Sequence, residues 1–385
     1  MPNAVIAGFV RTPFHFARKG SLAGVRPDDL AAIALKGLIE RTEIDPASIE
    51  DVILGCAYPE AEQGNNIARI AVLLAQLPIS VSGMTVNRFC GSSMSAIHIA
   101  AGQIAIGAGE VFVCGGVESM TRVPQGGFNF SPNPRFRYKD QPPAELLIEA
   151  YIAMGDTAEN VAAQYGVSRA EQERFAYASQ MKAAAAQAAG RLRDEIVPVM
   201  TEGGLVDTDG CLRPGTTLEG LAGLKPAFRP DGTVTAGTAS PLTDGASATL
   251  VCTEAYARAN GLEILARIRA VASAGCPPEI MGMGPVPATL KALERAGLAI
   301  GDIDVIELNE AFGSQAVACI RELGIDEERV NIDGGGIAVG HPLGATGARI
   351  TGKAAQIMKR EGKRLALSTQ CIGGGQGVAT ILEEM

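Results

Sequence analysis

The amino-acid sequence predicts an α/β protein with a largely parallel sheet. Short apolar runs of strand character alternate with longer stretches whose apolar residues recur at helical spacing. Such alternation is typical of strand–helix–strand units. At 385 residues the chain is long enough for two or three domains, since one domain averages roughly 150 residues. Its 47% of apolar and 19% of charged residues are typical of a folded globular protein.

The alternation is clearest in the first part of the chain. Residues 4–9 form an apolar run of strand length, and residues 30–41 have the apolar spacing of a helix. The same pattern predicts further strands and helices. The strands are expected at residues 51–54, 83–89 and 111–114, and the helices at residues 66–77 and 92–106.

The pattern is interrupted after Glu118. Residues 122–143 are rich in proline and aromatic residues, which predicts an inserted loop region. This region is interpreted either as a lid or oligomer contact, or as a surface loop with its own small apolar cluster. Further on, Ser168 and Glu171 have the spacing of a capping box that opens a helix ending near Gly190.

From residue 262 the alternation resumes. Residues 85–92 and 367–374 each pass from a strand into a cysteine and small residues, which indicates two similar halves that could place Cys90 and Cys371 face to face. The strands are expected at residues 266–272, 305–308, 330–333, 364–369 and 378–383, and the helices at residues 288–296, 310–323 and 345–360.

Charge and cysteine usage exclude several classes of protein. A net charge of −9 argues against a general role on nucleic acid or anionic membrane, and no apolar run approaches the ~20 residues that span a bilayer. The eight cysteines include no C-x-x-C pair, and the residues after Met1 do not resemble a signal segment. These features predict a reducing, cytoplasmic compartment.

Cys90 is a candidate nucleophile. It lies where a predicted strand gives way to a helix, and Gly91 and Ser92 allow a tight turn there. The positive end of the helix dipole would lower the pKa of its thiol and favour the thiolate. The alternative is that Cys90 is a small buried apolar residue, as many free cysteines are.

Three other residues are candidates for the same chemistry. Only three histidines are present, and His341 is the one in a glycine-rich segment, so it is the candidate base. Cys371 precedes a glycine-rich turn with exposed N–H groups. Asn309 follows the apolar run 305–308, where α/β proteins place polar site residues.

Two other kinds of site are not supported. The sequence of residues 347–354 resembles the motif of a phosphate-binding loop, but Ala354 stands at the last position, where the motif requires Ser or Thr. No complete G-x-G-x-x-G motif follows a strand, and no His or Cys cluster has metal spacing.

Five ordered segments resemble motifs of the thiolase family. They are NRFCGSS at Asn87, TAGTASPLTDGA at Thr235, NEAF at Asn309, GGGIAVGHPLG at Gly334 and CIGGGQG at Cys371. The resemblance implies two duplicated βαβαβαββ halves in a five-layer αβαβα arrangement, with an inserted loop domain. The first half would comprise residues 1–117 and 243–263, the loop domain residues 118–242, and the second half residues 264–385.

The resemblance also implies a role for each site residue. Cys90 would accept the acyl group as nucleophile, and His341 would take its proton. Cys371 would remove or return a proton at C2 of the second acyl-CoA. Asn309, through a water molecule, would join His341 in one oxyanion hole, and the N–H groups of Cys90 and Gly373 would form the other.

Coenzyme A is the expected substrate, with no permanently bound cofactor and no metal. By the same resemblance, Arg213 would lie near its adenine end and Ser240 along its pantetheine arm. The residues expected to line the apolar channel are Met154, Met281 and Phe312.

The implied function is that of a 3-ketoacyl-CoA thiolase of fatty-acid β-oxidation, an acetyl-CoA C-acyltransferase. The alternative is a biosynthetic acetoacetyl-CoA thiolase, an acetyl-CoA C-acetyltransferase. Biosynthetic relatives carry a His, which closes the acyl pocket, where this chain has Ala153. Ala153 therefore favours the degradative enzyme, unless Phe128 or Phe130 refills the space.

Other functions and partners stay open at this point. A ketoacyl synthase would lack a second catalytic cysteine such as Cys371, and a non-catalytic acyl-CoA carrier or redox-sensing thiol would not need the acid/base residues. The resemblance implies a homodimer or homotetramer, with a complex with other β-oxidation enzymes also open. The sequence does not fix the direction of the reaction, which depends on the concentrations of CoA and acyl-CoA.

Overall fold

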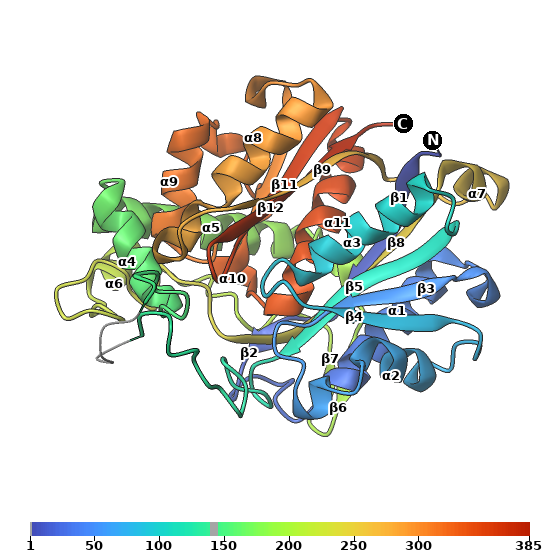
Figure 1. The fold of residues 1–385 in the computed structure, drawn as a ribbon, viewed down its shortest axis with the longest axis horizontal. Coiled ribbons are helices and arrows are strands. Elements are labelled where there is room, and N and C mark those ends of the chain that lie inside the picture. The colour runs from blue at the N-terminus through green and yellow to red at the C-terminus, as the bar shows by residue number, and fades with distance from the viewer. Residues whose placement is uncertain (1, 139–144) are drawn as a thin grey trace.

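The computed structural model describes residues 2–138 and 145–385. Among them, a ten-stranded sheet forms the centre of the molecule, with helices on both faces (Figure 1). A second sheet pairs only β6 (Val199–Thr201) with β7 (Gly204–Val206). No helix in the described part of the chain has both the length and the apolarity needed to cross a bilayer.

The first half of the fold alternates strands and helices and ends in two adjacent strands. Its chain order is interrupted before the last strand by the inserted region. The elements are β1 (Ala4–Arg11), α1 (Pro27–Thr42), β3 (Asp51–Gly55), α2 (Ile67–Leu74), β4 (Ser82–Val86), α3 (Ser92–Ala105), β5 (Val111–Ser119) and β8 (Thr243–Thr253), with β2 (His15–Phe16) paired to β8 and α7 (Glu254–Ala259) following it.

The second half repeats this order. Its strands lie in the sheet as β9-β12-β11-β10, which mirrors β1-β8-β5-β3 in the first half. The elements are β9 (Ala266–Gly275), α8 (Pro285–Ala296), β10 (Val305–Leu308), α9 (Gly313–Leu323), α10 (Gly336–Val339), α11 (Leu343–Glu361), β11 (Leu365–Ile372) and β12 (Gln376–Glu383).

The sheet is mixed, so the prediction of a largely parallel sheet is wrong. Parallel pairs join β3 to β4 and β5, and β10 to β11, whereas the other pairs in this sheet are antiparallel. The reason is that β12 returns beside β11 through a short turn, and that β8, which follows the inserted region, runs antiparallel to both β5 and β1. The two halves join through an antiparallel contact in which Val5 and Ile6 face Arg267 and Ala266.

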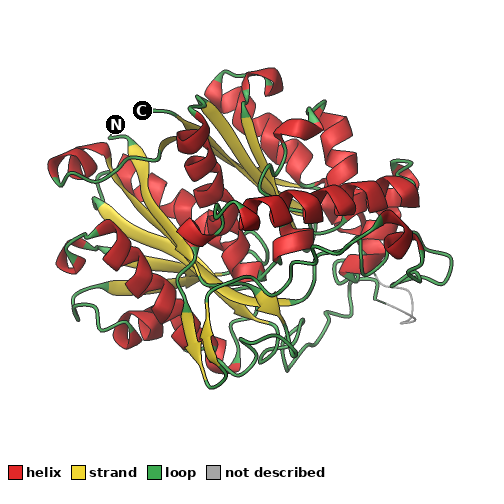
Figure 2. Ribbon diagram, turned by 180° about the vertical axis from the view of Figure 1, so that it is seen from behind, coloured by secondary structure: helices red, strands yellow, loops and turns green. Residues whose placement is uncertain are grey.

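The helices and strands form five layers. Helices α1 and α2 pack on the outer face of the first half-sheet, and α8 packs on the outer face of the second, next to α9. Helices α3 and α11 pack against each other and contact strands of both halves. Figure 2 shows these central helices between the two groups of strands. The N-terminal ends of α3 and α11 are buried, between the two half-sheets.

The core explains why the outer helices are amphipathic. In α1, Leu30, Ala34 and Leu38 recur every four residues and are all buried in one apolar cluster with strands β1, β5 and β8. Full burial of a leucine side chain contributes roughly 1.5–3 kcal/mol. The helical spacing predicted for residues 30–41 is thereby confirmed.

Residues 330–333 do not form the strand that was predicted. Val330 makes a single bridge to Ile306, and Asn331 has a φ of 48°, outside the strand region. The Asn331 side chain instead accepts the N–H of Leu308 at 2.9 Å and donates to its carbonyl at 2.8 Å. An amide side chain thus occupies the hydrogen-bonding edge of β10 that a strand would have paired.

Several observed strands begin or end at other residues than predicted, and in one case this changes the element on which a site residue lies. The strand predicted at 83–89 stops at Val86, and the one at 111–114 continues to Ser119. The strand predicted at 364–369 continues to Ile372, so Cys371 lies on β11 itself. Cys371 is thus on the counterpart of β5, whereas Cys90 follows β4, and the two cysteine segments are not equivalent in the repeat.

The inserted region lies between β5 and β8. The capping box at Ser168 and Glu171 is confirmed at the start of α5. In the proline-rich stretch, the ring of Tyr151 packs edge-on against Phe130 and Phe136, and Pro142 and Pro143 lie outside the described residues. The helices of this region are α4 (Met154–Gln164), α5 (Arg169–Ala188) and α6 (Leu218–Ala222).

Candidate active site

Cys90 lies in a tight turn between β4 and α3. Phe89 has a φ of 42°, which is strained for a residue with a side chain. The Phe89 N–H donates to Asn87 Oδ1 at 2.8 Å. Ser92 Oγ accepts the Arg88 N–H at 2.9 Å and donates to the Phe89 carbonyl at 2.6 Å. These bonds hold Cys90 at the N-terminal end of α3.

The Cys90 thiol is protonated at neutral pH. Burial raises its pKa to about 11, while the N–H groups of Gly373 and of Cys90 itself act in the opposite direction. The nearby carboxylate of Glu118 raises it as well. The prediction of a lowered thiol pKa is therefore wrong for this structure, because desolvation outweighs the donors at the helix terminus.

Cys371 lies at the end of β11 and is buried. Its pKa is raised well above the usual thiol value, first by burial and then by the proximity of the Cys90 thiol. The Gln370 side chain donates to the Cys90 carbonyl, and the Gly373 N–H faces the Cys90 sulfur. The end of β11 and the Cys90 turn are therefore held together by hydrogen bonds.

His341 and Asn309 are in direct contact. Asn309 Nδ2 lies 3.3 Å from His341 Nε2, and the other ring nitrogen, Nδ1, lies 2.6 Å from Thr346 Oγ1. The backbone N–H of His341 donates to Thr243 Oγ1 at 3.0 Å. Burial and the positive charge of Arg349 lower the pKa of His341 to about 3. The imidazole is therefore neutral at pH 7.

Packing links these two groups of residues. Cys90 packs against an apolar cluster that contains Leu343, two residues beyond His341. Cys371 belongs to a cluster with Ala311 and Phe312, which closely follow Asn309. The structure thus places Cys90, Cys371 and Gly373 in one group and Asn309 and His341 in another, and residues close in sequence to His341 and Asn309 pack against the first group.

The residues predicted to line an apolar channel also lie next to Cys371. Met281 and Phe312 are buried in its cluster, and the partly buried Met154 packs on them. A Cβ atom on Gly373 would lie 3.6 Å from the Met154 sulfur. Ser240 is at the edge of this group, because its N–H and hydroxyl donate to the Ala311 carbonyl at 3.0 and 3.1 Å.

Arg213 lies elsewhere. Its N–H donates to Gln180 Oε1 of α5 at 2.9 Å, and its guanidinium lies 3.5 Å from the Ile337 carbonyl of α10. Burial lowers its pKa. Among the contacts of the described residues, Arg213 is thus associated with the segment before His341 and not with the methionine cluster.

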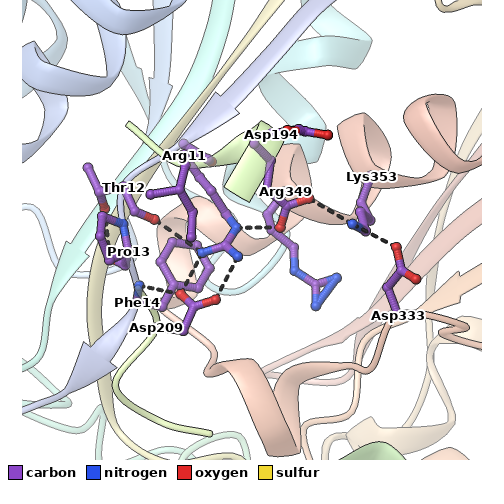
Figure 3. Close-up of polar contacts among 12 residues, drawn as sticks. Arg11, Thr12, Pro13, Phe14, Asp194, Asp209, Asp333, Arg349 and Lys353 are labelled. Atoms are coloured by element: carbon purple, nitrogen blue, oxygen red, sulfur yellow. Dashed lines mark hydrogen bonds and ion pairs between the residues drawn. The ribbon is translucent and has the colours of Figure 1, made fainter. Parts of the chain in front are cut away.

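The segment that leads to His341 begins at a buried charged network (Figure 3). Asp333 contacts Lys353 Nζ at 2.9 Å, and the same Nζ lies 2.9 Å from Glu195. Glu195 in turn accepts from Arg11 at 2.7 Å, and Arg11 forms a two-pronged contact with Asp209 at 2.6 and 2.7 Å. The network joins β1, the insertion and α11, and it fixes the start of the glycine-rich segment.

Sequence reasoning missed two residues that connect the site. Glu118 accepts the N–H groups of Ala57 and Gly344 at 2.8 and 2.9 Å, which ties the start of α11 to the first half. Its position near the end of a buried strand was an available signal. Thr346 had no such signal, because a Thr in a helix has many ordinary roles.

Comparisons with known proteins agree with this arrangement. The model of the thiolase N-terminal domain matches residues 4–255, and that of the thiolase C-terminal domain matches residues 262–384. Proteins named 3-ketoacyl-CoA thiolase from Bacillus subtilis and Pseudoalteromonas translucida are 48% and 47% identical to this chain, and each match covers 100% of both sequences.

A solved structure is also similar over the whole fold. The crystal structure of the Bacillus anthracis acetyl-CoA acetyltransferase matches with a TM-score of 0.90 and 38% identity, covering 100% of this chain and 99% of that one. Together with the two domain matches and the full-length relatives, this likeness means that the chain belongs to the thiolase family.

Proposed function

We propose that this protein is an acetyl-CoA C-acyltransferase that cleaves 3-ketoacyl-CoA with CoA and, in reverse, performs the Claisen condensation. The observation that carries the proposal is the placement of two cysteines, a neutral histidine, an asparagine and a backbone N–H that faces the Cys90 sulfur beside an apolar cluster. This set contains a nucleophile, a base, a second acid/base and oxyanion donors.

In the first half-reaction Cys90 attacks C3 of the 3-ketoacyl-CoA, and its thiol proton passes to His341 Nε2. The C2–C3 bond then breaks, which leaves the acyl group on sulfur and the electron pair on the acetyl-CoA enolate. Cys371 protonates C2 of that enolate, and acetyl-CoA leaves. The raised pKa of the Cys371 thiol supports this role, because a thiol that stays protonated is available as an acid.

In the second half-reaction the thiol of CoA gives its proton to the Cys371 thiolate and attacks the acyl-cysteine. The C–S bond to Cys90 then breaks, and the Cys90 thiolate takes its proton back from His341. CoA is therefore a substrate, and the scheme requires no permanently bound cofactor. The Cys90 N–H and the Gly373 N–H, which faces the Cys90 sulfur, are suited to the thioester oxyanion. Asn309 Nδ2 and protonated His341 are suited to the enolate oxyanion, and each such donor contributes about 10²–10³ in turnover.

We propose that Met154, Met281 and Phe312 contact the reactive end of the substrate, and that Ser240 lies along the pantetheine arm. Their common position beside Cys371 supports this assignment. Arg213 remains the candidate for the adenine end, where a partly buried guanidinium suits stacking on a base and pairing with phosphate.

Within the family we favour the degradative function on 3-ketoacyl chains longer than four carbons. Relatives at 47–48% identity carry the name 3-ketoacyl-CoA thiolase. Ala153 is the residue before α4 and is exposed beside Met154, and Phe130 is packed on Tyr151. Room for further methylenes is therefore expected, each worth up to roughly 0.8 kcal/mol, so two carbons would raise kcat/KM about tenfold.

The test compares kcat/KM for acetoacetyl-CoA with that for 3-ketohexanoyl-CoA and 3-ketooctanoyl-CoA. A strict preference for the four-carbon substrate would favour acetyl-CoA C-acetyltransferase activity, the name carried by the solved relative. Intact-mass spectrometry of protein incubated with acyl-CoA should detect one added acyl group, which Cys90→Ala should lose. If the acyl group maps to another cysteine, the assigned roles are incorrect.

We also propose a homo-oligomer in a reducing, cytoplasmic compartment. β4 lies at one edge of the large sheet, and Ile79, just before it, is 77% exposed, which suits association through this edge. All eight cysteines are free, and six are buried. Native mass spectrometry distinguishes a dimer or tetramer from a monomer, and fractionation of cells reports the compartment.

A further inference from the structure

The hydroxyl of Thr346 has two close polar neighbours. Its Oγ1 lies 2.9 Å from the Pro342 carbonyl oxygen, one helical turn earlier, and 2.6 Å from Nδ1 of His341. Thr346 is only 2% exposed. The arrangement of hydrogens around this oxygen is therefore decided by these two neighbours.

The Pro342 contact determines which way the Thr346 hydroxyl points. A carbonyl oxygen can only accept a hydrogen bond, so the single hydroxyl proton of Thr346 is directed at Pro342. Oγ1 can then only accept from His341 Nδ1, which must carry the ring proton. The opposite arrangement would leave two oxygen atoms 2.9 Å apart without a proton between them.

The other side of the ring agrees with this arrangement. A neutral imidazole with a proton on Nδ1 has a lone pair on Nε2. Asn309 Nδ2, a donor, lies 3.3 Å from that nitrogen. The direction of the Thr346 hydroxyl does not depend on how the Asn309 amide is oriented, so the contacts on the two sides of the ring are independent observations.

We propose that Thr346 is a positioning residue that holds His341 as the Nδ1–H tautomer, with Nε2 kept free as the base. The tautomer follows from the contacts of Thr346 alone, and only the role of Nε2 as the catalytic base rests on the proposed function. The partner on Nδ1 is a neutral hydroxyl and not a carboxylate. The buried carboxylates Glu307 and Glu310 are held by Arg349 and Ser179, each at 2.6 Å. The imidazolium formed during attack therefore gains no direct counter-charge and readily returns its proton.

The tautomer can be read directly by nitrogen-15 NMR. The chain has only three histidines, so protein labelled with [15N]histidine gives few signals, and His341→Asn identifies those of His341. The wild type should show Nδ1 protonated and Nε2 unprotonated at pH 7. A wild-type spectrum with the proton on Nε2 overturns the proposal, and this readout does not require the enzyme to be active.

Two variants separate a positioning role from a structural one. Thr346→Val keeps the shape of the side chain, and the Pro342 carbonyl keeps the N–H of Ala345 at 3.0 Å. This variant should populate both tautomers and lose about 10²-fold in kcat with little change in KM, within the range for a misoriented base. Thr346→Ser keeps the hydroxyl and should retain both the Nδ1–H tautomer and most of kcat.

If folded Thr346→Val keeps the wild-type tautomer and kcat, Thr346 has no positioning role. If Thr346→Val does not fold, the wild-type spectrum and Thr346→Ser still decide the question. A wild type that has the Nδ1–H tautomer but lacks thiolysis would refute the proposed function and leave the tautomer assignment standing.

Discussion

The rate at which Cys90 is alkylated should depend steeply on pH, because both members of its proposed pair are neutral at rest. A thiol with a pKa of about 11 is ionised to about one part in 10⁴ at pH 7. That fraction is about a hundredfold lower than for a thiol with the usual pKa of 9.0, so forming the thiolate costs roughly 3 kcal/mol more than it does for an ordinary cysteine. His341, with a pKa of about 3, supplies no positive charge above pH 5 to offset this.

The assay measures the rate of iodoacetamide modification at the Cys90 peptide by mass spectrometry between pH 5 and pH 10. The logarithm of the rate should rise by about one unit per pH unit with no plateau in this range, since only the thiolate reacts. Peptide-level detection is needed because Cys276 is also partly exposed, and its pKa is likewise raised by burial to about 11.

A plateau below pH 7 would refute this reasoning. It would mean that Cys90 and His341 exist as a thiolate–imidazolium pair, which requires the helix terminus and local donors to outweigh desolvation. Measurement of Cys90 in the His341→Ala variant separates the two cases. Loss of a neutral imidazole should leave the slope unchanged, whereas loss of an imidazolium would remove the plateau.

Three further outcomes are expected. Cys371→Ser should still be acylated at Cys90 but should lose hydrogen–deuterium exchange at C2 of acetyl-CoA, because a serine hydroxyl is a much weaker acid; retained exchange would exclude Cys371 from proton transfer. Lys353→Met removes a cation shared by two buried carboxylates and should lower the free energy of unfolding by about 3 kcal/mol in urea denaturation. Lys359→Met, at an exposed ion pair, should change the free energy of unfolding by less than about 1 kcal/mol. Equal effects would mean that the buried charged network does not fix this part of the fold. Asn309→Asp places a carboxylate beside Nε2, so it should raise the pKa of His341 toward its usual value and lower kcat by about 10²–10³, and an unchanged histidine titration by NMR would argue against the contact.

Local sequence was enough to predict most elements, because the information lies within one or two turns of chain. The capping box at Ser168 was visible as a Ser and a Glu three residues apart, and both bonds are present. The apolar repeat of α1 likewise needed only the residues of that helix. The motifs around Cys90 and His341 were readable for the same reason, since each is a continuous run.

Sequence alone failed where a distant segment decides the outcome. Residues 330–333 had strand character, but the Asn331 side chain takes over the edge of β10. The direction of β8 and β12 depends on how the chain returns to the sheet, which apolar spacing does not record. Such long-range pairing has no signature in a single stretch of chain.

The electrostatic state of the site was also decided by tertiary structure. The helix terminus at Cys90 is a local feature and pointed to a lowered pKa, whereas the burial that raises the pKa comes from packing with residues distant in the sequence, such as Ala17 and Leu343. The sequence by itself determined which chemical groups this protein has and on which elements they lie, while only the folded chain decided their solvation and hydrogen-bond partners, because both depend on atoms brought together across the two halves.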